Sequence, residues 1–134
     1  MRIVLTTHVF LPEHSAGTEV LTLNSAKELQ RQGHVVEVVT GFIAPPGRRN
    51  SQRFDTYEYE GIRVSRFLRS FVPTDEQSNI VEAEYNNHFF GSWFRNYLQN
   101  YNPDLVHFFH LGMLSASAID ICHSLGIPMV MTPT

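Results

Sequence analysis

The first forty or so residues alternate a short apolar run, a helical stripe and a second apolar run. Residues 2–7 are β-branched and apolar on both faces, which predicts a buried strand. A helix is predicted over residues 18–32, with Thr18 as its cap and Gly33 at its end, on an apolar stripe of helical period: Val20, Leu21, Leu23, Ala26 and Leu29. Residues 35–40 form the second predicted strand. Strands joined in this way run parallel, with a right-handed crossover.

A hairpin interrupts the alternation in the middle of the chain. Residues 54–59 and 62–67 alternate in polarity on either side of Glu60-Gly61, which predicts an antiparallel pair. Residues 44–53 are polar and rich in Pro and Gly, as surface loops are. A capping box at 74–77 then precedes four more expected elements: a helix at 80–100, a strand at 105–108, a helix at 113–125 and a strand at 129–132.

This order of elements predicts an α/β fold. We expect a Rossmann-like open, mostly parallel sheet with helices on both faces and a β-hairpin insertion. The 134 residues are enough for a single domain with a real core. Residues 127–134 read as a strand and the beginning of a loop, so we expect the sequence to be a piece of a longer protein.

Composition excludes several classes of function. The net charge of −3 shows no basic excess for nucleic acid. A single cysteine, Cys122, allows no disulfide within the chain and favours a reducing compartment, so a cytoplasmic location is expected. No apolar run approaches the roughly 18 residues of a membrane span, and the N-terminus is not a signal peptide.

Ligands of open parallel sheets bind at the carboxyl ends of the strands, near the point where the strand order reverses. Three predicted loops leave such ends, at residues 8–17, 109–112 and 133–134. We expect the sheet to bring the first two together. His8 and His14 in the first loop and His110 in the second are therefore candidates for contact with a substrate, although each has the alternative of simple solvation.

Ala16, Gly17 and Thr18 stand at the start of the first helix. Free N–H groups and the helix dipole favour an anion there, and Gly17 leaves room for its approach. The dinucleotide pattern G-x-G-x-x-G and the P-loop are both absent, so a glycine that only relieves crowding is the alternative. Glu19 lies in the first turn of this helix and has two possible roles. It stabilises the helix dipole, or its carboxylate holds the loop or a sugar hydroxyl in place.

The sequence shows no metal site and no catalytic triad. His107 and His110 lie three positions apart at a strand end, so their side chains point to opposite faces, and no Cys or carboxylate cluster accompanies them. We expect His107 to be a core histidine bonded to the backbone. No nucleophile, base and orienting group can be assembled from sequence spacing, and no cofactor is indicated.

Two further features favour structural interpretations. Arginines cluster around the hairpin, and a solvated face is the favoured reading, with contact to anionic lipid as the alternative: Arg48, Arg49, Arg53, Arg63, Arg66 and Arg69. The aromatic helix expected at 80–100 is favoured as core. Its apolar face is wide and includes His88, Trp93 and Phe94, so part of it could meet another domain.

Five short motifs follow one another along nearly the whole chain: PEHSAGTE (12–19), RQGHVVEVV (31–39), YEGIRVSR (59–66), PDLVH (103–107) and GIPMV (126–130). Together they resemble the N-terminal half of the family 4 glycosyltransferases of GT-B fold, in which the first motif is roughly P-x-x-G-G-x-E. The resemblance implies the acceptor-side domain of a retaining, metal-independent enzyme. It also implies that a nucleotide-sugar is a co-substrate, bound mainly by a C-terminal domain absent from this chain.

The resemblance also implies roles for single residues. Gly17 matches the second glycine of the donor loop, whereas Ala16 replaces the first and adds a methyl group near the donor diphosphate. Glu19 and His107 match the family glutamate and the strand-end histidine, and His110 falls among the histidines that follow. Thr134 stands about where many members carry a histidine near the transferred sugar. His110 and Thr134 are thus the candidates for a catalytic role.

Two hypotheses remain open. The first is half of a glycosyltransferase with a carbohydrate or lipid-linked acceptor, inactive as this chain alone. The second is a non-catalytic Rossmann-like module that binds a ligand or partner, with Ala16 and Thr134 as marks of decayed transferase features.

Overall fold

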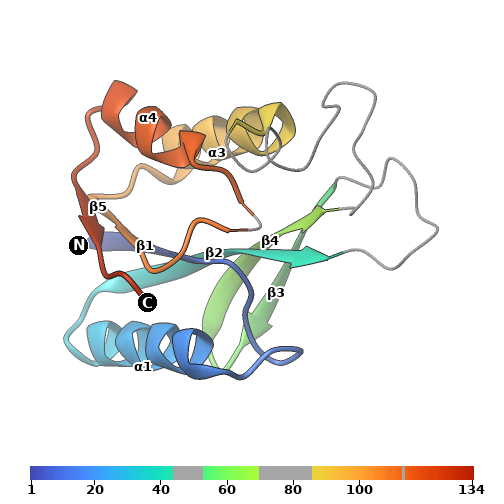
Figure 1. Cartoon of the computed structure of the whole chain (residues 1–134). Coiled ribbons are helices and arrows are strands. Elements are labelled where there is room, and N and C mark those ends of the chain that lie inside the picture. Colours follow the sequence, from blue (N-terminus) through green and yellow to red (C-terminus); the bar gives the residue numbers. More distant parts are fainter. Residues whose placement is uncertain (44–52, 70–85, 113) are drawn as a thin grey trace.

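The computed structural model describes residues 1–43, 53–69, 86–112 and 114–134, and these build one sheet with helices on both sides (Figure 1). The sheet has six strands in the order β3-β4-β2-β1-β5-β6. The strands are β1 (Arg2–Thr7), β2 (Val35–Ile43), β3 (Arg53–Tyr59), β4 (Ile62–Arg69), β5 (Leu105–Phe108) and β6 (Met129–Met131). Three helices are described: α1 (Gly17–Arg31), α3 (His88–Tyr101) and α4 (Ser117–Ser124).

The sheet is parallel except at one edge. β1 pairs with β2 on one side and with β5 on the other, and β2–β4 and β5–β6 are parallel as well. β3 pairs with β4 antiparallel, around a turn in which Glu60 and Gly61 have positive φ. The expected α/β fold, the mostly parallel sheet and the hairpin are therefore confirmed.

The helices cover the sheet from opposite sides, with α1 on one face and α3 and α4 on the other (Figure 1). Successive residues of β1 alternate between the two layers, since Ile3 and Leu5 pack in the core cluster of α1 and Val4 in that of α3 and α4. A strand buried on both faces needs apolar residues at every position, which is why β1 reads as a continuous apolar run.

Several element bounds differ from the sequence prediction. β1 and β5 lie where they were expected, but α1 begins at Gly17 and not at Thr18. Its N-cap is Ala16, which makes no side-chain hydrogen bond, so the prediction that Thr18 caps this helix is wrong. Gly33, with a φ of 95°, follows the helix end as expected, because the left-handed region costs glycine little.

α3 is shorter than expected at its amino end. Asn86 and Asn87 are not helical, and Asn87 caps the helix by accepting a hydrogen bond from the N–H of Phe90 at 3.0 Å. The prediction of helix through these two residues is wrong, because an asparagine cap stops the helix more strongly than the apolar period extends it. The capping box at 74–77 and the helical residues expected at 80–85 lie outside the described part of the chain.

α4 and the last strand are also shorter than expected. The helix begins at Ser117, and Leu114 to Ala116 are not helical, so the prediction of a helix over these three residues is wrong. Residue 113, where the helix was expected to begin, lies outside the described part of the chain. Strand β6 ends at Met131, with Thr132 just beyond it. Within the described residues, no helix is long and apolar enough to span a bilayer.

Candidate functional site

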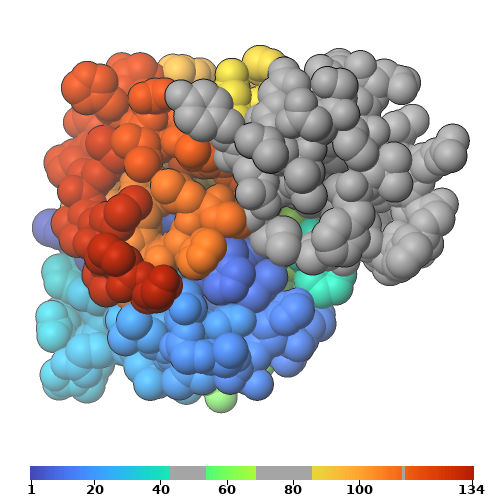
Figure 2. Space-filling model, viewed as in Figure 1, coloured from blue at the N-terminus to red at the C-terminus, as the bar shows by residue number. Residues whose placement is uncertain are grey.

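The strand order places the first and second candidate loops side by side. The chain moves from β1 outward to β2 and later returns to the other side of β1 to form β5, so the order reverses between β1 and β5. The two strands end together, since Thr6 pairs with Phe108 and the N–H of Phe109 donates to the carbonyl of Thr6 at 2.8 Å. In Figure 2 the segments after β5 and β6 lie beside the first loop on one face.

His8 and His110 meet at this point. Their ring centroids are 4.2 Å apart, with the planes tilted by 35°. The N–H of Gly112 donates to Nδ1 of His110 at 2.9 Å, so a neutral His110 ring carries its proton on Nε2 and can donate it to a ligand. A β-carbon on Gly112 would lie 2.8 Å from Cε1 of His110, so only glycine leaves the ring in this position.

Glu19 lies under the same loops and is almost completely buried, at 3% exposure. Among the described residues its Oε2 atom has no hydrogen-bond partner. A carboxylate that served only the helix dipole would be expected at the surface, so burial favours the alternative, a role in fixing the loop or a bound hydroxyl group. Thr6 also has a buried hydroxyl without a described partner. Sequence reasoning missed it, because Thr6 reads as an ordinary residue of the first strand.

The electrostatics of His8 follow from this packing. Burial lowers the pKa of His8 most, and the neighbouring His110 lowers it further, while the Glu19 carboxylate opposes both and His14 adds a small lowering. At neutral pH the His8 imidazole is therefore uncharged. The His8 ring can therefore donate or accept a hydrogen bond beside His110 without bringing a positive charge to this place.

The start of α1 carries free backbone donors. The first intrahelical bond runs from the N–H of Val20 to the carbonyl of Ala16, and no cap side chain serves the preceding groups. Within the described structure the N–H groups of Gly17, Thr18 and Glu19 thus lack a protein acceptor. No atom lies within 4 Å of a β-carbon built on Gly17. This helix start is open and fits an anion.

His107 lies apart from the His8–His110 pair. Its Nε2 atom is 2.8 Å from the hydroxyl of Thr132, and its ring stacks on Phe109 at 4.2 Å. The expectation that His107 bonds to the backbone is therefore wrong, because the chain just after β6 brings the Thr132 hydroxyl within reach of its ring. Burial lowers the pKa of His107. Thr134 is tied to the same region, since its hydroxyl donates to the carbonyl of Phe109 at 3.1 Å.

The hairpin holds the first loop in place, a contact that sequence reasoning missed. Arg66 forms two hydrogen bonds with Asp55 and reaches Glu13 at 3.2 Å, and its side chain is only 16% exposed. The hydroxyl of Tyr57 donates to the carbonyl of Leu11. The interpretation of the arginines as a solvated face is therefore wrong for Arg66. The ring of His14 lies at the surface, 6.2 Å from that of Phe42.

The remaining expectations concern a metal ion and the aromatic helix. Across the described ranges, no group of three or more His, Cys, Asp or Glu side chains is arranged to hold a metal ion. Phe90, Phe94 and Leu98 are buried in the core as expected, whereas Phe89 is 41% exposed. Arg63 is largely exposed, near Glu37.

A family model described as Glycosyltransferase Family 4 matches residues 15–133. Since the match covers most of the sequence, the chain belongs to that family and is a glycosyltransferase-like domain. No curated protein matches the chain. Among solved structures it is similar to one described as "Trehalose-6-phosphate from E. coli bound with UDP-2-fluoro glucose", with 10% identity and a TM-score of 0.46. That alignment covers 99% of this chain and 32% of the other, so this chain spans about a third of it.

Proposed function

We propose that this chain is the acceptor-side domain of a glycosyltransferase that moves a sugar from a nucleotide-sugar to a carbohydrate or lipid-linked acceptor. The observation that carries the proposal is the meeting of the loops after β1 and β5 at the strand-order reversal, with His8 against His110, in a chain that belongs to glycosyltransferase family 4. Open parallel sheets hold their ligands in a crevice at this place, and we use that word for it here. In this proposal residues 1–134 form one Rossmann-like domain, and a second, C-terminal domain holds most of the donor.

The donor side of the crevice is the tip of the first loop, formed by Ala16, Gly17 and Thr18. Its free N–H groups, together with the helix dipole, favour the negative charge that develops on a departing diphosphate. Fixed donors of this kind support a mechanism without a resident metal or other cofactor. Retention of the anomeric configuration is a family trait that we extend to this chain.

The acceptor side of the crevice is formed by His8, His14, Glu19, His107 and His110. The imidazoles of His8 and His107, whose pKa is lowered by burial, and the buried Glu19 carboxylate offer both donors and acceptors to the hydroxyl groups of an acceptor. His110 and Thr134 are the candidates for direct contact with the reacting atoms. Because the Thr134 hydroxyl already donates to a backbone carbonyl, His110 is the stronger of the two.

The proposal also covers where the enzyme acts and what the 134-residue chain does by itself. The enzyme acts in the cytoplasm, with peripheral contact to a membrane where its acceptor is lipid-linked. Alone, the 134-residue chain lacks the groups that hold the nucleotide, so it is expected to turn over no substrate.

The test is turnover by the protein encoded by the complete gene. It is incubated with UDP-, GDP- and ADP-linked sugars, and release of the free nucleoside diphosphate is measured with and without candidate acceptors. Release is expected from one donor, at a rate that falls at least about tenfold in His110→Ala, a loss of roughly 1.4 kcal/mol of transition-state stabilisation. The control is His123→Ser, because His123 is exposed and lies on α4, outside the crevice.

The second candidate function is a non-catalytic module that binds a ligand or partner. Ala16 in place of a glycine and the bonded hydroxyl of Thr134 favour it. If the complete protein releases no diphosphate with any donor while the 134-residue chain binds a nucleotide-sugar tightly, this second function replaces the first. Weak or absent binding by the 134-residue chain, together with turnover by the complete protein, establishes the transferase.

A further inference from the structure

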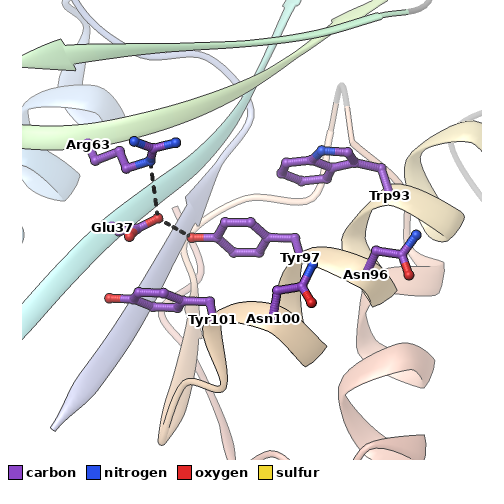
Figure 3. Close-up of a pocket in the computed structure, with 7 residues that line it drawn as sticks. All are labelled: Glu37, Arg63, Trp93, Asn96, Tyr97, Asn100 and Tyr101. Atoms are coloured by element: carbon purple, nitrogen blue, oxygen red, sulfur yellow. Dashed lines mark hydrogen bonds and ion pairs between the residues drawn. The ribbon is translucent and has the colours of Figure 1, made fainter.

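A second concave site lies between α3 and the amino ends of β2 and β4 (Figure 3). We name it the α3 groove. It has a volume of about 580 Å³, within the range of roughly 300–1,000 Å³ typical of small-molecule sites. Glu37 and Arg63 lie near the amino ends of β2 and β4. The groove is therefore at the opposite end of the strands from His8 and His110, which follow the carboxyl ends of β1 and β5. Its lining residues are Glu37, Arg63, Trp93, Asn96, Tyr97, Asn100 and Tyr101.

The aromatic rings of the groove are largely stacked on one another. Trp93 stacks on Phe54 at 4.6 Å and on Tyr97 at 5.0 Å, and Tyr97 stacks in turn on Tyr101 at 5.7 Å. The guanidinium group of Arg2 lies 5.7 Å from the centre of the Tyr101 ring. Because these partners already occupy the ring faces, the groove offers little stacking surface to a flat ligand such as a nucleobase.

The charges of the groove are balanced. The Glu37 carboxylate accepts a hydrogen bond from the Tyr97 hydroxyl at 2.8 Å and lies 3.9 Å from Nε of Arg63 (Figure 3). These opposite charges lie close together and largely cancel each other. The groove therefore offers no net charge that would attract an ion of either sign.

The hydrogen-bonding groups of the groove are not all used within the protein. The Tyr101 hydroxyl has no partner among the described residues, but it is buried and not open to a ligand. Asn96 and Asn100 are exposed on the same face of α3, one turn apart, and each amide offers a carbonyl oxygen and an NH₂ group. These two amides thus present donors and acceptors together on the wall that α3 forms.

We propose that the α3 groove binds a neutral, polyhydroxylated molecule of the size of one or two sugar rings. A hydroxyl group both donates and accepts, so it suits a wall with two exposed amides, each of which offers a donor and an acceptor. This site is separate from the crevice of the proposed function and does not depend on it. It holds an unreacting sugar, such as a remote part of a glycan.

The single tryptophan of the chain, Trp93, lines the groove and reports on it directly. Tryptophan emission of the 134-residue chain is followed while methyl α-D-glucopyranoside, methyl α-D-mannopyranoside or maltose is added. A saturable change is expected with at least one of them, with a Kd on the order of 1 mM. The double variant Asn96→Ala, Asn100→Ala is expected to weaken binding at least about tenfold, or 1.4 kcal/mol.

The matched control is Gln99→Ala, an exposed residue of the same helix that does not line the groove. It is expected to bind as the unmodified chain does. The proposal is overturned if none of the three sugars gives a saturable change, or if the double variant binds as tightly as the control. It is equally overturned if UMP or glucose 6-phosphate binds the groove more tightly than the neutral sugars, since a charged or flat ligand would then be the better fit. Neither result bears on nucleotide-sugar turnover, so the two proposals fail separately.

Discussion

At the scale of single residues, the crevice depends on a pair of stacked histidines whose positions are set by their neighbours. His8 is half-buried, and His110 is held from behind by the N–H of Gly112. Two imidazolium ions in contact would repel each other in this partly dry site. Burial lowers the pKa of His8 most and the neighbouring His110 lowers it further, so the His8 ring is neutral at neutral pH and this repulsion is avoided.

Acidification is expected to destabilise the fold through His8. Its pKa is lower in the folded chain than the ordinary value near 6.5, so below that value the unfolded chain binds the proton more readily. The contribution is fully present above pH 6.5 or so and is lost as the pH falls toward the folded pKa. Urea unfolding at several pH values measures this slope, and His8→Gln is expected to reduce it.

Part of the slope is expected to remain in that variant, because burial lowers the pKa of His107 as well. A slope in His8→Gln equal to that of the unmodified chain would show that His8 has no part in it. The corresponding double variant, His8→Gln with His107→Gln, is expected to have the smallest slope.

At the scale of elements, the first loop is long but is fastened to the hairpin by Arg66. The guanidinium group lies between the rings of Phe42 and Tyr57, at 4.6 and 5.1 Å from their centres, while it pairs with Asp55 and Glu13. The hydrogen bond to Asp55 raises the pKa of Arg66 most and Glu13 adds to it, so the guanidinium group keeps its charge. The hairpin thus positions the candidate site without lining it.

Removal of this cation is expected to loosen the first loop. Arg66→Met should cost about 1–3 kcal/mol of unfolding free energy, because Asp55 and Glu13 lose their charged partner. Hydrogen exchange of the amides of Leu11, Glu13 and His14 should become faster. Arg63→Met is the control, expected within about 0.5 kcal/mol of the unmodified chain, since its side chain is 63% exposed. Equal exchange rates in the two variants would contradict the fastening role.

The start of α3 depends on the Asn87 cap. Asn87 is completely buried; its side chain accepts from Phe90, and its backbone N–H donates to the Ser115 hydroxyl at 3.0 Å. Asn87→Ala is expected to cost about 1–2 kcal/mol in urea unfolding. Gln99→Ala, at an exposed position of the same helix, serves as the comparison and should change stability little. A cost no larger than that of Gln99→Ala would show that the cap is dispensable.

At the scale of the whole molecule, the layer of α3 and α4 is closed around Cys122. This thiol is fully buried among the aromatic side chains of the core, and burial raises its pKa to about 12. Since the thiolate is the reactive form, the folded chain has almost none at neutral pH.

The reaction of Cys122 with a disulfide reagent is therefore a measure of global opening. In native buffer the thiol is expected to react at least about a hundredfold more slowly than in denaturing urea, because an opening that costs several kcal/mol must come first. Absorbance of the released thiolate gives the rate, and the single cysteine makes its assignment unambiguous. Rapid reaction in native buffer would show that the α3–α4 layer opens locally.

Prediction from the sequence succeeded for elements whose signal is local. β1 and β5 were located to the residue, because strands buried on both faces are short apolar runs with clear limits. The hairpin was located from its glycine turn. The amino end of α3 was misplaced, because apolar periodicity continues past a cap and the side-chain hydrogen bond of Asn87 marks the true start. The amino end of α4 was misplaced as well, and its N-cap, Ala116, makes no side-chain hydrogen bond that could mark it.

For the candidate site, the sequence indicated which residues to consider, and tertiary structure decided how they act. The closeness of the first two loops was expected from the parallel sheet, but the contact between the His8 and His110 rings and the glycine contact that orients His110 were not. The burial of Glu19 and the fastening by Arg66 also escaped prediction, because both depend on residues far apart in the chain.

The sequence by itself determined the α/β class, the parallel βαβ unit and the loops that carry polar residues at strand ends. These follow from period and turn chemistry, which act over a few residues. Only the tertiary structure decided the strand order beyond β1 and β2, the partner of His107, the free N–H groups at α1 and the α3 groove. Each of these depends on which distant segments pack together, and that choice is made by burial and hydrogen bonding across the whole molecule.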